Sequence, residues 1–165
     1  MTTETKDLKV VETVELDFKH FAENIRPWDA REVAASYPGV ELEDALRLCV
    51  EASRRTWVGF VDGLPVLMAG VADIDGAPHV GCPWFLATTK FPVVSFSKVA
   101  PYYIGLMAEG KTLLYNYVAS GNKLAHRWLR RTGFTLSDQP FNHGGTQFVE
   151  FKLCVPQPSS QPSAP

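Results

Sequence analysis

The sequence lacks several features that mark specialised classes of protein. Its three cysteines, Cys49, Cys82 and Cys154, are odd in number and have no metal-type spacing, so they indicate neither a disulfide framework nor a zinc site. No apolar run is long enough to span a membrane. The first residues are rich in Thr and Glu and lack the apolar centre of a signal peptide. We therefore expect a protein with reduced thiols that is made in a cytoplasm.

An excess of charge of one sign is also lacking. Sixteen Lys and Arg residues face 18 Asp and Glu residues, and the net charge of -2 gives no electrostatic reason to expect nucleic acid as a partner. Four basic residues nevertheless share one predicted helix: Lys123, Arg127, Arg130 and Arg131. They form either a solvated face that suits the end of a helix or a surface for anions, and we favour the first interpretation.

What the sequence does contain is enough apolar material for one domain. It has 165 residues, of which 45% are hydrophobic, and this supports a single core. We expect a flexible segment over residues 1–8 and one domain over residues 9–155. Residues 156–165 are rich in Pro and Ser and are predicted to be disordered.

The clearest local pattern runs from Leu113 to Phe134. Residues 113–118 are apolar and aromatic enough for a buried strand. Residues 119–122 form a turn that ends on Asn122, a good helix N-cap. The helix that follows places apolar and basic residues on opposite faces, and Gly133 suits the position just past its end.

The remaining patterns predict a mixed set of elements. Strands are expected over residues 10–16, 56–61, 64–71, 79–88, 134–137 and 146–153, and helices from about 27 to 36, over 41–54 and over 95–109. Asp62-Gly63 predicts a tight hairpin between two of the strands. Residues 18–24 remain ambiguous.

The pattern around the helix after Asn122 resembles the GNAT acyltransferase superfamily. In that family an Asn is followed at fixed spacing by an Ala and a Gly-Phe pair, here Ala125, Gly133 and Phe134. The run Arg26-Pro27-x-Asp29-x-x-Glu32 also resembles the opening of many GNAT domains. The resemblance implies an α+β fold, with a central mixed and mostly antiparallel sheet flanked by about four helices. It also implies acetyl-CoA bound where two central strands splay apart.

The resemblance points to residues for acetyl-CoA, although the Gly-rich phosphate loop of the family is absent. The corresponding residues 89–98 contain no glycine, and Pro92 removes a backbone donor. Lys90, Ser95 and Ser97 could contact phosphate through their side chains; the alternative is a plain loop before a helix. Backbone amides near Leu86 and Thr88 are expected to polarise the acyl carbonyl. The side chain of Asn122 is expected to cap its helix, to contact CoA, or both.

The acid and base of the family are also missing at their usual positions. The helix Tyr that acts as general acid is here Leu129, which cannot donate a proton. Tyr117 or Tyr115 is a substitute on the preceding strand. The strand over residues 79–88 has no carboxylate, so His79 is the candidate base. His126 is expected to be solvated.

A narrower resemblance is to the small GNAT-like assembly or internal virion proteins of T7-like bacteriophages. It rests on the runs Asn116–Asn122, Trp128-Leu129 and Trp84–Thr88. Two functions follow from it. The protein is either an N-acyltransferase that uses acetyl-CoA, or a catalytically reduced scaffold that contacts phage virion or host proteins during assembly. Its expected place is the host cytoplasm or the virion, with no membrane and no metal; the oligomeric state is left open.

Overall fold

The computed structural model describes residues 7–158, so the predictions for residues 1–6 and 159–165 lie outside the described part. The elements follow in this order: β1 (Lys9–Glu12), α1 (Phe18–Asn24), α2 (Pro27–Ser36), α3 (Leu42–Glu51), β2 (Ser53–Val61), β3 (Leu64–Ile74), β4 (Ala77–Ala87), α4 (Val93–Met107), β5 (Leu113–Ala119), α5 (Lys123–Arg131), β6 (Thr135–Leu136), β7 (Phe141–His143) and β8 (Thr146–Cys154). No helix within residues 7–158 is long and apolar enough to cross a membrane.

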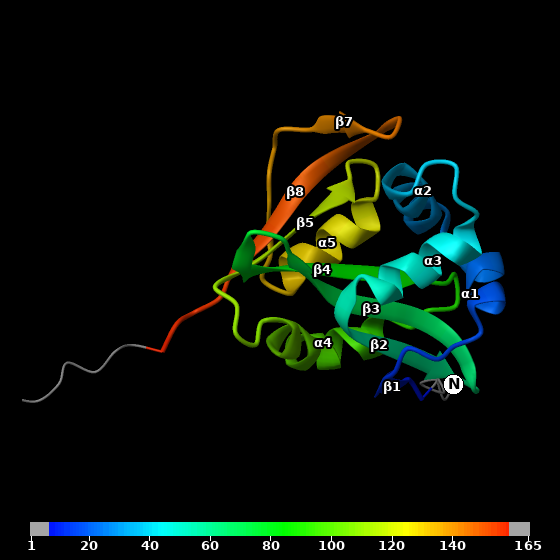
Figure 1. Ribbon diagram of the computed structural model, residues 1–165. Coiled ribbons are helices and arrows are strands. Elements are labelled where there is room, and N and C mark those ends of the chain that lie inside the picture. The colour runs from blue at the N-terminus through cyan, green and yellow to red at the C-terminus, as the bar shows by residue number, and fades with distance from the viewer. Residues whose placement is uncertain (1–6, 159–165) are drawn as a thin grey trace, which may run out of the picture.

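One mixed sheet carries the fold. Its strands lie in the order β1-β2-β3-β4-β5-β8-β6, and β7 pairs with β8. All pairs are antiparallel except β4 with β5. The predicted hairpin between β2 and β3 is confirmed: Asp62 and Gly63 both have positive φ, as a type I′ turn requires. Figure 1 shows the sheet with helices on both of its faces.

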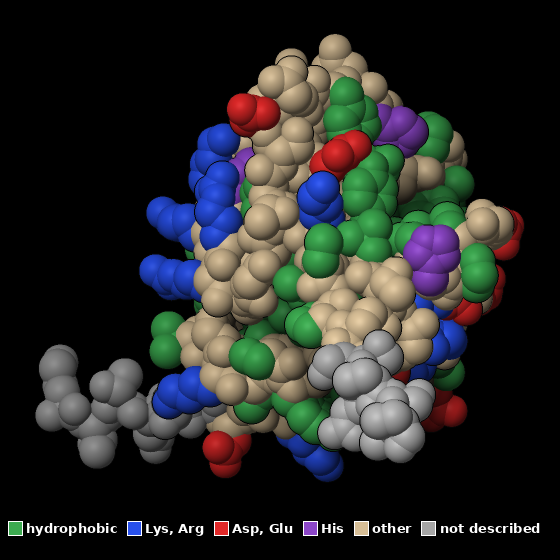
Figure 2. Space-filling view, turned by 90° about the vertical axis from the view of Figure 1, so that its left-hand side faces the viewer, with side chains coloured by type: hydrophobic (Ala, Val, Ile, Leu, Met, Phe, Trp, Pro, Cys, Tyr) green, Lys and Arg blue, Asp and Glu red, His purple; other side chains and the backbone are tan. Residues whose placement is uncertain are grey.

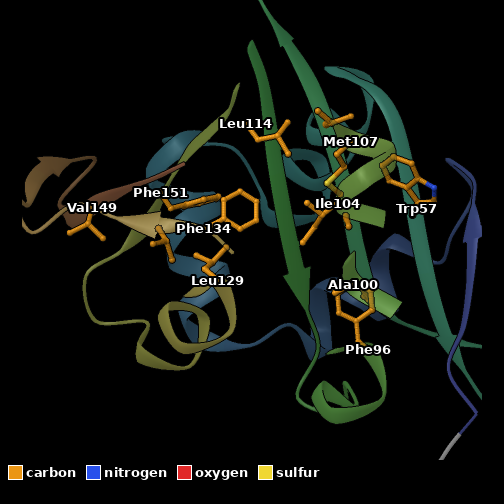
Figure 3. Packing of buried hydrophobic residues seen from close by; sticks show 14 residues of the cluster. Trp57, Phe96, Ala100, Ile104, Met107, Leu114, Leu129, Phe134, Val149 and Phe151 are labelled. Atoms are coloured by element: carbon orange, nitrogen blue, oxygen red, sulfur yellow. The ribbon is translucent and has the colours of Figure 1, made fainter. Parts of the chain in front are cut away.

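Two of the three hydrophobic clusters among the described residues show which helices cover which face of the sheet. Trp84 and Leu86 of β4 pack in a cluster with residues of α1, α2 and α3. Phe85, between them, packs against the cluster that contains α4 and α5. Neighbouring side chains of a strand point to opposite faces, so α1–α3 cover one face and α4 and α5 the other. Figure 3 shows Ile104 and Met107 of α4 and Leu129 of α5 in this second core.

The predicted α+β fold with a mixed, mostly antiparallel sheet is confirmed, but the described residues form five helices instead of about four. The additional helix is α1, over the segment whose sequence was ambiguous. It has only two turns, too few for a clear hydrophobic period. Asp17 caps it, because its side chain accepts a 2.9 Å hydrogen bond from the N–H of His20. Strand β7 is a second difference, because the sequence suggested a turn for part of this segment.

Helix α5 follows the predicted pattern with two corrections. Asn122 caps it through the N–H of Ala125, Gly133 has φ of +100°, and Leu129 is buried. The expectation of a solvated His126 is wrong: only 6% of this residue is exposed. Leu124, assigned to the apolar face, is 41% exposed. Both differences arise because the start of α5 lies against α2 and the turn after β5 rather than over the core.

Candidate functional site

The site lies where β4 and β5 separate. The two strands pair only at Val80–Leu113 and Gly81–Leu114. Further along, the side chain of Asn116 bridges them, its Nδ2 donating to the backbone oxygen of Pro83 at 2.9 Å. Beyond this bridge the two strands form no further backbone pairs, so backbone groups on their facing edges bind other partners.

A cavity of about 560 Å³ fills the gap between the two strands. Its walls include Phe85, Leu86 and Ala87 of β4, Asn116–Val118 of β5, and residues from both layers of helices: Asp29, Glu32, Val33, Phe96, Leu124, Ala125 and Trp128. Since residues from both faces line it, the cavity passes through the sheet. Trp128 forms its inner wall on the α5 side, with its ring 4.8 Å from that of Phe85.

Asp29 of α2 closes the end of β4. The backbone N–H of Ala87 donates to Oδ2 of Asp29 at 2.8 Å. Arg26 Nε lies 3.4 Å from the same oxygen, and the N–H of Arg26 donates to the carbonyl of Ala87 at 2.9 Å. Asp29 is only 4% exposed. Oδ2 of Asp29 therefore holds the start of α2 to the end of β4.

Glu32, one helical turn further along α2, performs the same task at β5 with one oxygen. Its Oε1 accepts the N–H of Ala119 at 2.9 Å and Nδ2 of Asn122 at 3.0 Å. Its Oε2 has no hydrogen-bond partner among residues 7–158. This oxygen is not one of the fully buried polar atoms that lack a partner in that part of the chain, so it keeps some exposed surface. Glu32 lines the cavity, so its free oxygen is open to it.

Asn122 joins the two carboxylates to α5. Besides capping α5 with Oδ1, it donates from Nδ2 to Glu32 and, at 3.4 Å, to Oδ1 of Asp29. His126, on the next turn, places Nε2 at 2.9 Å from the carbonyl of Ala119, which fixes this nitrogen as the protonated one. The predicted capping role of Asn122 is thus confirmed, and its amide is directed at the carboxylates.

Burial sets the protonation of this cluster. It raises the pKa of Glu32 to about 7, with a further rise from the charge of Asp29, against the hydrogen bonds of Asn122 and Ala119. It also raises the pKa of Asp29, and Arg26 opposes that rise. The pKa of His126 is lowered, again chiefly by burial. Glu32 can therefore exchange a proton near neutral pH, as a general base must.

Within residues 7–158, the start of α4 offers two free backbone groups, and of the side chains predicted there only that of Ser97 is already engaged. Pro92 is the N-cap and gives no side-chain hydrogen bond. The N–H groups of Val94 and Ser95 have no acceptor among the described residues. The hydroxyl of Ser97 donates to the carbonyl of Val93 at 2.8 Å, so it is occupied. Lys90 is exposed beside a smaller pocket.

The other residues suggested by the sequence are scattered. Leu86 and Tyr117 line the cavity. Thr88 is buried, and its N–H donates to the carbonyl of Val66. The amides of Ala87 and Thr88 are therefore engaged, and the predicted use of amides around Leu86 and Thr88 for the acyl carbonyl is wrong for these two. His79 is exposed near the far end of β4, more than about 20 Å along the strand from Ala87.

Tyr117 takes part in a short chain of hydrogen bonds. The hydroxyl of Tyr115 lies 2.8 Å from the carboxylate of Glu150 and 3.0 Å from the hydroxyl of Tyr117. Tyr115 has one proton and donates it to the carboxylate, so Tyr117 donates its own proton to Tyr115. Tyr117 also lines the cavity, and in this arrangement its proton is engaged with Tyr115.

The run that contains Asp29 and Glu32 is visible in the sequence, but neither residue was predicted to have a catalytic role. A signal was present: two carboxylates three residues apart lie on one face of a helix. Their burial was not visible from sequence, because it depends on how α2 meets the ends of two distant strands. Within residues 7–158 no group of three or more His, Cys, Asp or Glu residues could hold a metal.

The basic residues of α5 lie outside this cluster. Lys123, Arg127, Arg130 and Arg131 are exposed, as predicted for a solvated face. Figure 2 shows Lys and Arg side chains gathered along one edge of the molecule, beside a face where hydrophobic side chains are frequent. Arg130 and Arg131 lie in the last turn of α5, where positive charge is favourable.

Comparison with known proteins identifies the architecture. The sequence matches no protein-family model and no curated protein. The structure is similar to an acetyltransferase of the GNAT family from Streptococcus pneumoniae, with a TM-score of 0.60, 11% identity and coverage of 91% of this chain and 100% of the other. For a ribosomal-protein-alanine N-acetyltransferase from Brucella melitensis the TM-score is 0.64, with 14% identity and coverage of 89% and 99%. For an aminoglycoside acetyltransferase in complex with coenzyme A, the TM-score is 0.59 and the identity 16%, with coverage of 90% of this chain and 95% of the other. The fold is that of the GNAT acetyltransferases.

Proposed function

We propose that this protein is an N-acyltransferase that transfers an acetyl group from acetyl-CoA to an amine. The observation that carries the proposal is the cavity through the sheet, which brings an apolar groove on the α4/α5 side to an unpaired oxygen of Glu32. The fold likeness to acetyltransferases supports the reaction class but, at such low identity, no particular substrate.

The residues present fit acetyl-CoA in part. The N–H groups of Val94 and Ser95 lack acceptors, and a helix start with free amides is a favourable place for phosphate. Phe85 and Trp128 would contact the pantetheine arm, and the indole Nε1 of Trp128 is buried without an acceptor among the described residues. Bound acetyl-CoA would supply an activated acyl group as its thioester. The loop has no glycine, so its backbone could approach the phosphates less closely than in the family pattern, and Pro92 has no N–H to donate.

We infer that Glu32, rather than His79, accepts the proton of the amine. It lines the cavity and has a free carboxylate oxygen, and its raised pKa suits proton transfer near neutral pH. Buried Leu129 offers no proton for a leaving thiolate. Tyr117 lines the cavity and is the candidate proton source, which requires its hydroxyl to release Tyr115 and turn toward the leaving thiolate.

The first experiment is calorimetric binding of acetyl-CoA, with desulfo-CoA and 3′-dephospho-CoA as comparisons. Leu124→Trp should weaken binding at least about tenfold, because this exposed side chain lies at the cavity wall and a larger ring would narrow it. Leu48→Trp is the matched control, since Leu48 is similarly exposed on α3 and does not line the cavity. Absence of binding at millimolar acetyl-CoA would refute the proposal.

The second candidate is a catalytically reduced scaffold for assembly of a phage particle, acting by contact with virion or host proteins in the host cytoplasm or the virion. Two observations favour it. Asp29 already occupies the amide of Ala87, and Leu129 is buried where the family has an acid. Copurification of the protein with phage particles, without acetyl-CoA binding, would support this function over the first.

A further inference from the structure

The part of the cavity on the α2/α3 side has aromatic walls, and we call it the aromatic chamber. It is formed by Tyr37, Trp84, Tyr117, Phe141 and Phe148, with Glu32 on the α2 side. The rings of Tyr117 and Phe141 lie 4.8 Å apart at 73°, and those of Phe141 and Phe148 lie 6.1 Å apart. Tyr117 belongs to this side because its neighbours Asn116 and Val118 point toward α4 and α5.

Charge in the cavity is almost entirely paired. Of the charged residues that line it, Arg26 and Asp29 face each other. Glu32 has no ion pair among the described residues, and its Oε2 has no hydrogen bond there. His143 lies exposed in β7, at the rim. The aromatic chamber therefore offers one unpaired carboxylate oxygen among apolar rings.

We propose that the aromatic chamber binds the acceptor, and that the acceptor is an amine with a single positive charge on an apolar or aromatic body. The role of this amine as acceptor rests on the proposed acyl transfer, but its binding to the chamber does not require acetyl-CoA. The ammonium group pairs with Oε2 of Glu32 and lies against ring faces, which attract cations. The body of the amine fills the space between the rings.

The same arrangement disfavours two other kinds of acceptor. A polyamine or an aminoglycoside brings several positive charges, and all but one of them would be buried without a partner. A neutral compound of the same shape leaves the carboxylate of Glu32 unpaired. The single unpaired carboxylate of Glu32 thus favours an acceptor with one positive charge, and the aromatic rings favour an acceptor with an apolar body.

Binding in the absence of acetyl-CoA tests this inference separately from acyl transfer. We expect 2-phenylethylamine to bind at least about tenfold more tightly than 2-phenylethanol or spermidine, by calorimetry at pH 8. A tripeptide amide that begins with Phe carries the same amine on a peptide. If it binds more tightly than 2-phenylethylamine, the acceptor is a protein amino terminus; the reverse indicates a small amine, and both results support the proposal.

Two variants connect the binding to the chamber. Glu32→Gln keeps an oxygen for Ala119 and Asn122 but loses the charge, and it should weaken 2-phenylethylamine at least about tenfold. Glu51→Gln, on the exposed end of α3, should have no effect. If Glu32→Gln fails to fold, Tyr117→Leu replaces it as the test variant. It removes one ring of the chamber and should also weaken the binding of 2-phenylethylamine. Equal binding of the alcohol, tighter binding of spermidine, or no binding of any probe would overturn the inference, whether or not acetyl-CoA binds.

Discussion

The backbone N–H of Ala87 donates a 2.8 Å hydrogen bond to the carboxylate of Asp29, which fastens the first turn of α2 to the last residue of β4. This amide would otherwise point into the gap between the splayed strands. The contact therefore both stabilises the fold and reduces the donors available to a bound thioester.

The first prediction concerns this contact. Asp29→Ala should lower the free energy of unfolding by about 1–3 kcal/mol, because the amide of Ala87 loses its partner in a buried place. Asp44→Ala, on the exposed side of α3, should change it by less than about 0.5 kcal/mol. Denaturant unfolding measures both. A loss in Asp29→Ala no larger than in the control would mean that water replaces the carboxylate without cost.

The second prediction is a pH dependence of stability caused by Glu32. Its pKa is raised from the ordinary 4.5 to about 7, so the folded protein holds this proton more tightly than the unfolded chain does. The resulting stabilisation is complete below pH 4.5 and is lost as the pH rises through 7. Relative to Glu32→Gln, the native protein should lose roughly 3 kcal/mol between pH 4 and pH 8. Parallel stability profiles of the two proteins would show that Glu32 titrates normally.

The third prediction separates two candidate bases. With an amine acceptor, Glu32→Gln should lower kcat/KM by about 100-fold or more, the usual contribution of a general base. His79→Ala should leave kcat/KM within about twofold, since His79 is exposed near the opposite end of β4. In the native protein, kcat/KM for the proposed reaction should rise with pH through about 7. The reverse pattern in the two variants would return the role to His79.

The fourth prediction concerns the turn between β5 and α5. A Cβ atom on Gly121 would overlap the ring of Trp28, so Gly121→Ala should cost about 1–3 kcal/mol or shift α2. Gly105→Ala is the control: it lies inside α4 with nothing near its Cβ position, and it should stabilise the protein by up to about 1 kcal/mol. Similar melting temperatures for the two variants would contradict this account.

Local chemistry explains how much of the fold could be predicted. The hairpin at Asp62-Gly63, the capping by Asn122 and the turn at Gly133 depend on neighbouring residues alone, so the sequence predicts them correctly. His126 shows the limit. Its position among basic residues indicates solvent, yet it is buried against the carbonyl of Ala119, because the turn after β5 folds back over it.

The candidate site was harder to predict, because it is assembled from distant segments. Asn122 and Tyr117 could be suggested from one helix and one strand, but Glu32 meets Ala119 and Asn122 only through the packing of α2. The strand predicted over residues 79–88 has no carboxylate, so the sequence suggested His79 as the base. The carboxylates come instead from a helix on the other side of the gap.

Because α2 fastens itself to β4 through Asp29 and to β5 through Glu32, the spacing of the two strands is set by a helix rather than by a ladder of backbone bonds. One rigid-body displacement of α2 would release the amides of Ala87 and Ala119 together. Their hydrogen-exchange rates should therefore rise and fall in step, and a ligand wide enough to part the strands would loosen both amides at once.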